Sequence, residues 1–241
     1  MDRTTRLAVL IDADNAQASL IKELLEEVAR YGTATVKRAY GDWTTTDLRG
    51  WKSELHQHAI QPMQQFRYTA GKNATDSALI IDAMDLLHSK NVEGFCLVSS
   101  DSDFTRLATR IREAGLLVYG FGQGKTPEAF RAACNKFVFV EILTQQPTTV
   151  ETEARRSTVE ATKLQPLLMK AVEAAAREDG WASLGLVGST LQKSDSSFDE
   201  RNYGFRKLSD LVRKQSYLEV KEQRGGKDGE SVHLFVRLRQ R

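Results

Sequence analysis

Short apolar runs alternate along the first part of the chain with segments in which apolar residues recur every three or four positions. The apolar runs predict strands over Leu7–Ile11, Thr33–Tyr40, Ile60–Phe66, Gly94–Ser99, Leu116–Gly120 and Phe137–Val140. The periodic segments predict helices over Ala18–Tyr31, Thr45–His58, Thr75–Lys90, Asp103–Ala114 and Pro127–Ala133. This alternation indicates an α/β fold, with right-handed crossovers and a mostly parallel sheet that helices cover on both faces. Functional sites in such sheets form at the carboxyl ends of the strands.

A different pattern follows in the last third of the chain. Residues 145–163 have no apolar stripe and are rich in Thr and Glu, which is typical of a linker. Beyond them we expect helices over Leu164–Arg177, Ser183–Lys193 and Tyr203–Gln215, then strands over Tyr217–Glu222 and Ser231–Leu238 joined by a turn at Arg224–Glu230. Three helices and a hairpin describe a small winged-helix domain. The sequence therefore predicts domains at residues 1–144 and 164–241.

The net charge of +2 is unevenly distributed. Residues 1–145 hold 17 basic and 18 acidic side chains, and residues 164–241 hold 14 basic and 11 acidic. The basic excess of the second domain indicates contact with a polyanion, although a solvated surface of mixed charge looks similar. Leu7–Ile11 is too short for a signal-peptide core or a membrane span, so we expect a cytoplasmic protein.

Neither the cysteines nor the histidines are spaced for a metal site. The two cysteines, Cys96 and Cys134, form no CxxC pair, which favours reduced structural thiols. The four histidines are too scattered for a zinc site.

Aspartates stand where the predicted strands end and one helix begins. Asp12 ends the first strand, Asp101 and Asp103 follow the fourth, and Asp76 opens the helix between them in sequence. Two carboxylates about 4 Å apart repel each other by ~1–4 kcal/mol, so a gathered set requires a counter-ion. Oxygen ligands without histidine or cysteine point to Mg²⁺ or Mn²⁺.

Each aspartate alone has a simpler interpretation. Asp101 is suited to cap the helix that begins near Asp103, and Asp76 to a first helical turn, where the helix dipole favours an acid. Asp12 would then be the polar end of a buried strand. The joint pattern favours a metal site.

The motifs IDADN, GKNATDSALIIDAMDLL, LVSSDSDF and GFGQGKTPEAFRAACNKF, in this order, resemble the NYN family, the LabA-like branch of the PIN-like nucleases, from Leu7 to Leu143. The resemblance implies a Rossmann-like fold and Mg²⁺- or Mn²⁺-dependent cleavage of RNA. It assigns Asp12, Asp76 and Asp101 as metal-binding aspartates, Asp103 as the fourth acid and Asn15 as a strand-end asparagine of the catalytic site. Ala13 departs from the glycine of many members.

The second domain resembles an OST-HTH (LOTUS) domain, and the likeness is carried by the segments GWA, FDERNYGF and LSDLV. The resemblance implies binding of RNA or of a protein. The pairing of NYN and OST-HTH modules in one chain is a known arrangement, and it supports both assignments.

Together these features predict a metal-dependent ribonuclease with a C-terminal RNA-binding module. Basic residues that would contact RNA, unless they are only solvated, are Lys72, Arg67, Lys125 and Arg131 in the first domain and Arg206, Lys207, Arg213 and Lys214 in the second. Trp43, Trp51 and Tyr68 are suited to stack bases but also fit core positions.

Two other functions remain open at this stage. A DxD phosphatase would use Asp12 as nucleophile and Asp14 as acid, but Asn15 and Ala16 stand where that motif calls for other residues. A non-catalytic RNA-binding adaptor would carry the same aspartates as vestiges.

Overall fold

The computed structural model describes residues 4–66, 74–143, 164–225 and 231–239. The chain divides into two compact units, residues 1–145 and 146–241, and each is taken by itself. The expected linker, Arg67, Tyr68, Lys72 and most of the turn Arg224–Glu230 lie outside the described residues.

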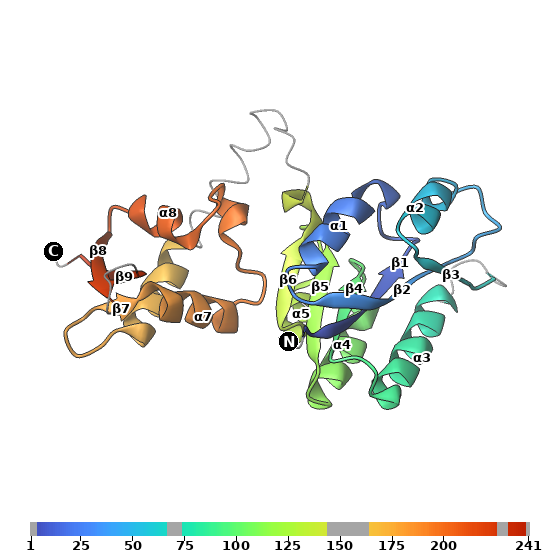
Figure 1. Ribbon diagram of the computed structural model, residues 1–241, viewed down its shortest axis with the longest axis horizontal. Helices are drawn as coiled ribbons and strands as arrows, with labels where there is room; N and C mark the ends of the chain where they lie inside the picture. Colours follow the sequence, from blue (N-terminus) through green and yellow to red (C-terminus); the bar gives the residue numbers. More distant parts are fainter. Residues whose placement is uncertain (1–3, 67–73, 144–163, 226–230, 240–241) are drawn as a thin grey trace. The chain divides into compact units, whose positions relative to one another are not determined.

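A six-stranded, fully parallel sheet forms the centre of the first unit, in the order β3-β2-β1-β4-β5-β6. The strands are β1 (Arg6–Asp12), β2 (Thr33–Gly41), β3 (Gln61–Gln64), β4 (Gly94–Val98), β5 (Leu117–Gly122) and β6 (Lys136–Phe139). The chain builds outward from β1 to β3, then crosses back to place β4 beside β1 (Figure 1). The direction of winding therefore reverses between β1 and β4, whose carboxyl ends border the crevice where such sheets bind ligands.

Helices cover both faces of this sheet, as the sequence predicts (Figure 1). They are α1 (Ile21–Val28), α2 (Trp51–Gln57), α3 (Ala74–Ser89), α4 (Thr105–Glu113) and α5 (Glu128–Ala133), with short 3-10 turns η1 (Ala18–Leu20), η2 (Ser102–Phe104) and η3 (Val140–Ile142). In β1, Ala8 and Leu10 join the core under α3, α4 and α5, while Leu7, Val9 and Ile11 join the core under α1 and α2. A central strand buried on both faces explains the unbroken apolar run that ends at Asp12.

The helix expected over Thr45–His58 begins only at Trp51. The preceding residues form turns, because the Asp42 carboxylate accepts hydrogen bonds from the backbone and side chain of Thr44 (3.2 and 2.6 Å), and Thr45 Oγ1 donates to the Asp42 carbonyl (2.9 Å). Such side-chain bonds give the backbone an alternative to the helical ladder. The sequence prediction was therefore wrong for the first half of this segment.

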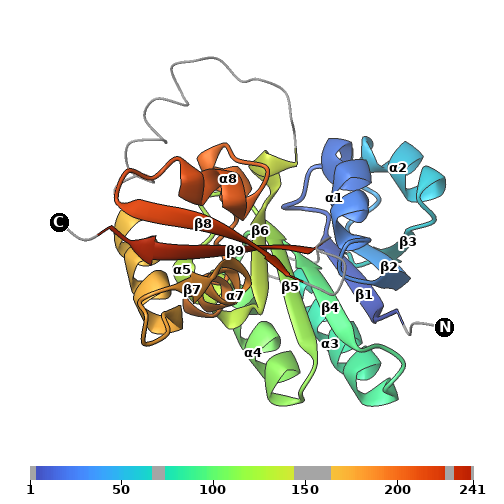
Figure 2. The same cartoon turned by 60° about the vertical axis from the view of Figure 1, so that its left-hand side comes forward.

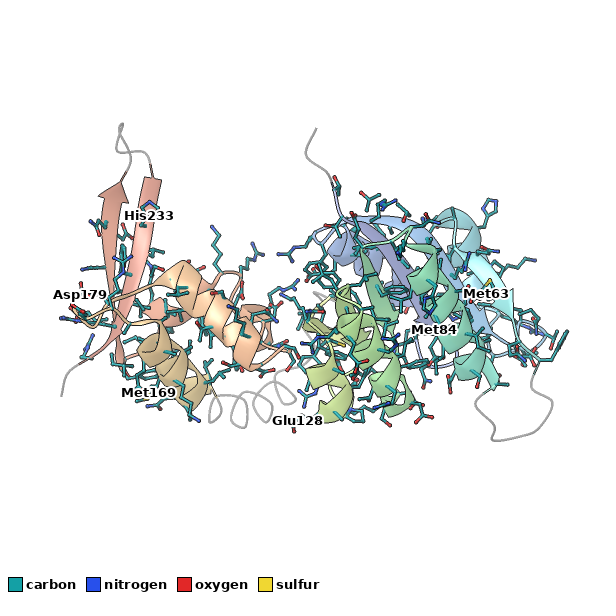
Figure 3. The ribbon with its side chains drawn as sticks, turned by 90° about the horizontal axis from the view of Figure 1, so that it is seen from below. Met63, Met84, Glu128, Met169, Asp179 and His233 are labelled. Carbon is teal, nitrogen blue, oxygen red and sulfur yellow. The ribbon has the colours of Figure 1, made fainter. Side chains whose placement is uncertain are left out.

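The second unit packs helices against a small antiparallel sheet of order β7-β9-β8 (Figures 2 and 3). Its elements are a helix over residues 164–175, α7 (Leu184–Ser194), η4 (Glu200–Tyr203), α8 (Leu208–Arg213), β7 (Ala182–Ser183), β8 (Leu218–Gly225) and β9 (Ser231–Leu238). The single helix expected over Tyr203–Gln215 is instead broken, because Gly204 takes a left-handed conformation (φ +80°) and ends η4. The sequence also missed β7, which is only two residues long.

Within the ranges that the structure covers, no helix is long and apolar enough to cross a membrane.

Candidate metal centre

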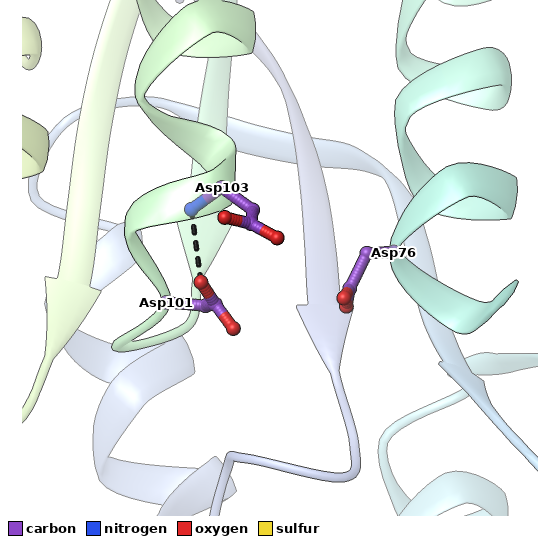
Figure 4. Close-up of side chains that lie close together, drawn as sticks. All are labelled: Asp76, Asp101 and Asp103. Carbon is purple, nitrogen blue, oxygen red and sulfur yellow. Dashed lines mark hydrogen bonds between the residues drawn. The ribbon is translucent and has the colours of Figure 1, made fainter. Parts of the chain in front are cut away.

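Three carboxylates lie close together near the carboxyl ends of β1 and β4. One oxygen each of Asp76, Asp101 and Asp103 lies within 4.8 Å of the other two (Figure 4). Asp76 projects from the first turn of α3, Asp101 follows β4 after two serines, and Asp103 lies in η2. Segments far apart in the sequence therefore bring three of the four expected aspartates to one point.

The loop that carries Asp101 is held by its own side chains. Asp101 Oδ1 accepts a hydrogen bond from the Asp103 amide (2.9 Å), and the Asp101 amide donates to Ser99 Oγ (3.1 Å). Asp101 therefore caps η2, as its simpler interpretation requires. The cap occupies only one of the two carboxylate oxygens, so capping and metal binding are compatible in this residue.

Asp12 is the buried acid of the site, with 1% of its surface exposed. Its Oδ2 atom accepts hydrogen bonds from Asn15 Nδ2 (2.6 Å) and Ser99 Oγ (2.8 Å). Its Oδ1 atom has no hydrogen-bond partner among the residues that the structure describes. Burial raises the pKa of Asp12, while the bonds from Asn15 and Ser99 act in the opposite direction. A buried oxygen without a partner costs about 1–3 kcal/mol, a penalty that a bound cation would remove.

Asp12 does not belong to the group of three, but its charge acts on that group. The pKa of Asp76 is raised to about 6, first by burial and then by repulsion from Asp12, Asp101, Asp103 and Asp14. The site thus concentrates negative charge that a divalent cation would offset. Its donors are carboxylate oxygens, which suit a hard divalent cation and fit no soft-ligand zinc centre.

Ser99 is a residue of this site that the sequence interpretation missed. It is buried (4% exposed), donates to Asp12 and accepts from the Asp101 amide, so one hydroxyl ties the ends of β1 and β4 together. The signal was a serine one position beyond a buried strand. It could not be interpreted without knowing that β4 lies beside β1.

Asn15 is exposed, and its amide donates to Asp12, so it is placed to orient this carboxylate. Lys125 is exposed in the turn after β5, at the same edge of the sheet. Arg131 instead lies partly buried with its guanidinium 5.7 Å from the centre of the Phe139 ring. Arg67 and Lys72 lie outside the described residues.

The basic residues predicted for the second unit lie on or beside α8. Arg206, Lys207 and Lys214 are exposed. Arg213 forms an ion pair with Glu222 of β8, which offsets its charge.

Comparison with known proteins adds two domain assignments. The sequence model of the NYN domain matches residues 6–142, and that of the OST-HTH/LOTUS domain matches residues 156–229. No curated protein matches the chain significantly.

Several solved structures are similar to parts of the chain. A protein of unknown function from Vibrio parahaemolyticus is 18% identical, over 57% of this chain and 93% of that one, with a TM-score of 0.48. A segment (residues 175–257) of a Chromobacterium violaceum protein is 46% identical, over 32% of this chain and 82% of that one, with a TM-score of 0.28. An uncharacterized Nitrosomonas europaea protein is 31% identical, over 32% and 73%, with a TM-score of 0.29.

Proposed function

Since this chain belongs to the NYN domain family, within the PIN-like nuclease superfamily, we propose that it is a metal-dependent ribonuclease. Its second unit is an OST-HTH/LOTUS domain, a class that binds RNA, and this supports RNA as the substrate. The observation that carries the proposal is the group of Asp76, Asp101 and Asp103, whose oxygens converge within 4.8 Å at the winding reversal of the sheet.

Different side chains of the site would bind the cation and the phosphodiester. Asp76, Asp101 and Asp103 offer the converging oxygens, and Asp12 adds a buried oxygen without a protein partner. Asn15 and Ser99 fix the Asp12 carboxylate from two sides. Lys125 adds a positive charge at the same edge, suited to a phosphate. A bound Mg²⁺ or Mn²⁺ would activate a water for attack and offset charge that develops on the phosphate.

The burial of Asp12 argues against the phosphatase alternative. That reaction would use Asp12 as an exposed nucleophile, but only 1% of this residue is accessible and one of its oxygens accepts two hydrogen bonds. The adaptor alternative differs from the proposal only in the absence of cleavage, so an activity assay separates the two.

The test uses the full chain and end-labelled single-stranded RNA, with Mn²⁺, Mg²⁺ or a chelator. Asp101→Asn is the informative variant, because asparagine caps helices as well as aspartate does and should keep η2 intact. Asp85→Asn, on the exposed side of α3, is the matched control. We expect wild type and Asp85→Asn to cut RNA with metal, and Asp101→Asn or chelator to abolish cutting.

Equal cutting by wild type and Asp101→Asn would remove Asp101 from the catalytic set. RNA binding by all three proteins without cutting by any of them would establish the adaptor instead. DNA of the same sequence, tested in parallel, shows whether the enzyme discriminates by the 2′-hydroxyl.

A further inference from the structure

The sheet of the second unit has one face turned to the core and one turned away. Leu218 and Val236 are buried in the core, so their neighbours along each strand point to the opposite face. The register places Glu219 opposite Arg237, Lys221 opposite Phe235 and Gln223 opposite His233 on that outer face. Figure 3 shows His233 on this hairpin. The outer face therefore carries cationic, polar and aromatic side chains together with the acidic Glu219.

Trp181, the residue before β7, extends this outer face. Ala182 pairs with Val236 and is buried, so Trp181, one position earlier, lies on the other side. Lys221 Nζ lies 4.2 Å from the centre of the Trp181 ring, and Arg237 Cζ lies 4.6 Å from it. The half-buried ring thus stands between strand residues that carry positive charge.

A second aromatic ring continues the arrangement. Phe235 has Lys221 Nζ at 5.7 Å and Arg177 Cζ at 5.8 Å from its ring centre. Glu219 pairs with Arg237 (2.7 Å), but neither Arg177 nor Lys221 has a carboxylate partner among the described residues. These two cations are available to a polyanion.

An open pocket adjoins this face and shares Arg177, Phe235 and His233 with it. Its lining also includes Ser183, the N-cap of α7, and Gly185 and Ser189 of the first half of α7, together with apolar residues. These small side chains leave room for a nucleic-acid backbone beside the rings.

Aromatic rings interleaved with cations are the features that bind single-stranded nucleic acid, because bases stack on the rings while the cations hold phosphates. Among the described residues, the exposed cations that flank α8 make no cation–π contact with an aromatic ring, and Arg213 of α8 is paired with Glu222. We propose that the outer face formed by Trp181, Phe235, Lys221, Arg237 and Arg177 is the single-stranded RNA-binding surface of this chain. The proposal rests on RNA as the substrate, and it places recognition on the sheet instead of on α8.

The test measures binding of a fluorescent single-stranded oligouridine to the full chain in chelator, where no metal-dependent cleavage occurs. Trp181→Ala should weaken binding about tenfold, the order expected when a stacked base loses its ring. Trp181→Phe should restore most of the affinity. Lys221→Gln, an exposed change, should lower the slope of log affinity against log salt by about 0.7, the effect of one lost phosphate contact.

Variants of two other lysines in the same unit serve as controls for the binding assay. Lys193→Gln, exposed near the end of α7, should leave binding unchanged, and Lys214→Gln probes the rival surface at α8. Wild-type affinity in both Trp181→Ala and Lys221→Gln, with loss in Lys214→Gln, would overturn the proposal in favour of α8.

The cleavage assay separates the two claims. A wild type that cuts RNA but does not bind the oligouridine without metal would overturn the surface while leaving the ribonuclease intact. A wild type that neither binds nor cuts would overturn both.

Discussion

Replacing Asp76 with asparagine should stabilise the metal-free protein. The pKa of Asp76 is raised from 3.8 to about 6. At ~1.4 kcal/mol per unit, this shift sets an upper limit of ~3 kcal/mol on the cost of its charge in the folded state. Partial exposure to solvent reduces the figure to ~1.5 kcal/mol. The favourable interaction of the carboxylate with the first turn of α3 offsets ~0.5 kcal/mol of it. We therefore expect Asp76→Asn to raise the free energy of unfolding by ~1 kcal/mol near pH 7.5 in chelator.

The pH dependence of this effect has a definite sign. An acid whose pKa is higher in the folded state binds more protons folded than unfolded between the two values. The contribution of Asp76 to the free energy of unfolding is therefore fully present below its unfolded pKa of 3.8. It is lost as the pH rises through the folded-state pKa of about 6. The excess stability of Asp76→Asn over wild type should accordingly be small near pH 3.8 and reach its full size above pH values of about 6.

The assay is thermal unfolding of the full chain in chelator at several pH values, beside Asp85→Asn as the matched control. A gain of ~1 kcal/mol corresponds to a rise of about 3 °C in the transition of a unit this size. Mn²⁺ should then raise the Tm of wild type more than that of Asp76→Asn. A variant destabilised by ~1 kcal/mol or more in chelator would contradict this expectation, because Asp76 would then act mainly as a helix-stabilising acid.

Three further predictions concern the surroundings of the site. Asp101→Asn should keep metal-free stability within ~0.5 kcal/mol of wild type, because the cap survives, but should lose the heat of Mn²⁺ binding in calorimetry; a large loss of stability would show that Asn does not replace the cap. Ser99→Ala should cost ~1–3 kcal/mol in urea unfolding, since Asp12 and the Asp101 amide both lose a partner; an unchanged midpoint would contradict the bridging role. Tyr40→Phe should lower the free energy of unfolding in urea by ~1–2 kcal/mol, because the buried hydroxyl donates to Asp82 of α3. Asp82 also pairs with Arg38. An unchanged free energy of unfolding would show that this contact does not hold α3 against the sheet.

The hydrophobic pattern predicted most of the first unit because its sheet is buried on both faces. Continuous apolar runs such as Leu7–Ile11 leave little choice of element. Prediction failed where local polar contacts decide the backbone, as around Asp42, or where one glycine breaks a periodic segment, as at Gly204. The two-residue strand β7 has no periodicity to detect.

The clustering of Asp76, Asp101 and Asp103 could be predicted because each stands just beyond a strand end or at a helix start. Their partners could not, because strand order is a property of the folded sheet. Only the adjacency of β1 and β4 shows that Ser99 meets Asp12. The outer face of the second sheet was missed for a related reason, since alternating positions such as Lys221 look merely solvated until the register sets Phe235 and Trp181 beside them.

In the proposed function, the aspartate cluster cuts RNA with the help of a divalent metal. Its most direct test is the initial rate of cleavage of end-labelled single-stranded RNA by wild type and by Asp76→Asn at saturating Mn²⁺. We predict cleavage by wild type that chelator abolishes. Asp76→Asn should lose at least about 100-fold in rate, the order seen when a group that stabilises transition-state charge is removed. Equal rates for the two proteins, or cleavage by wild type that persists in chelator, would contradict it.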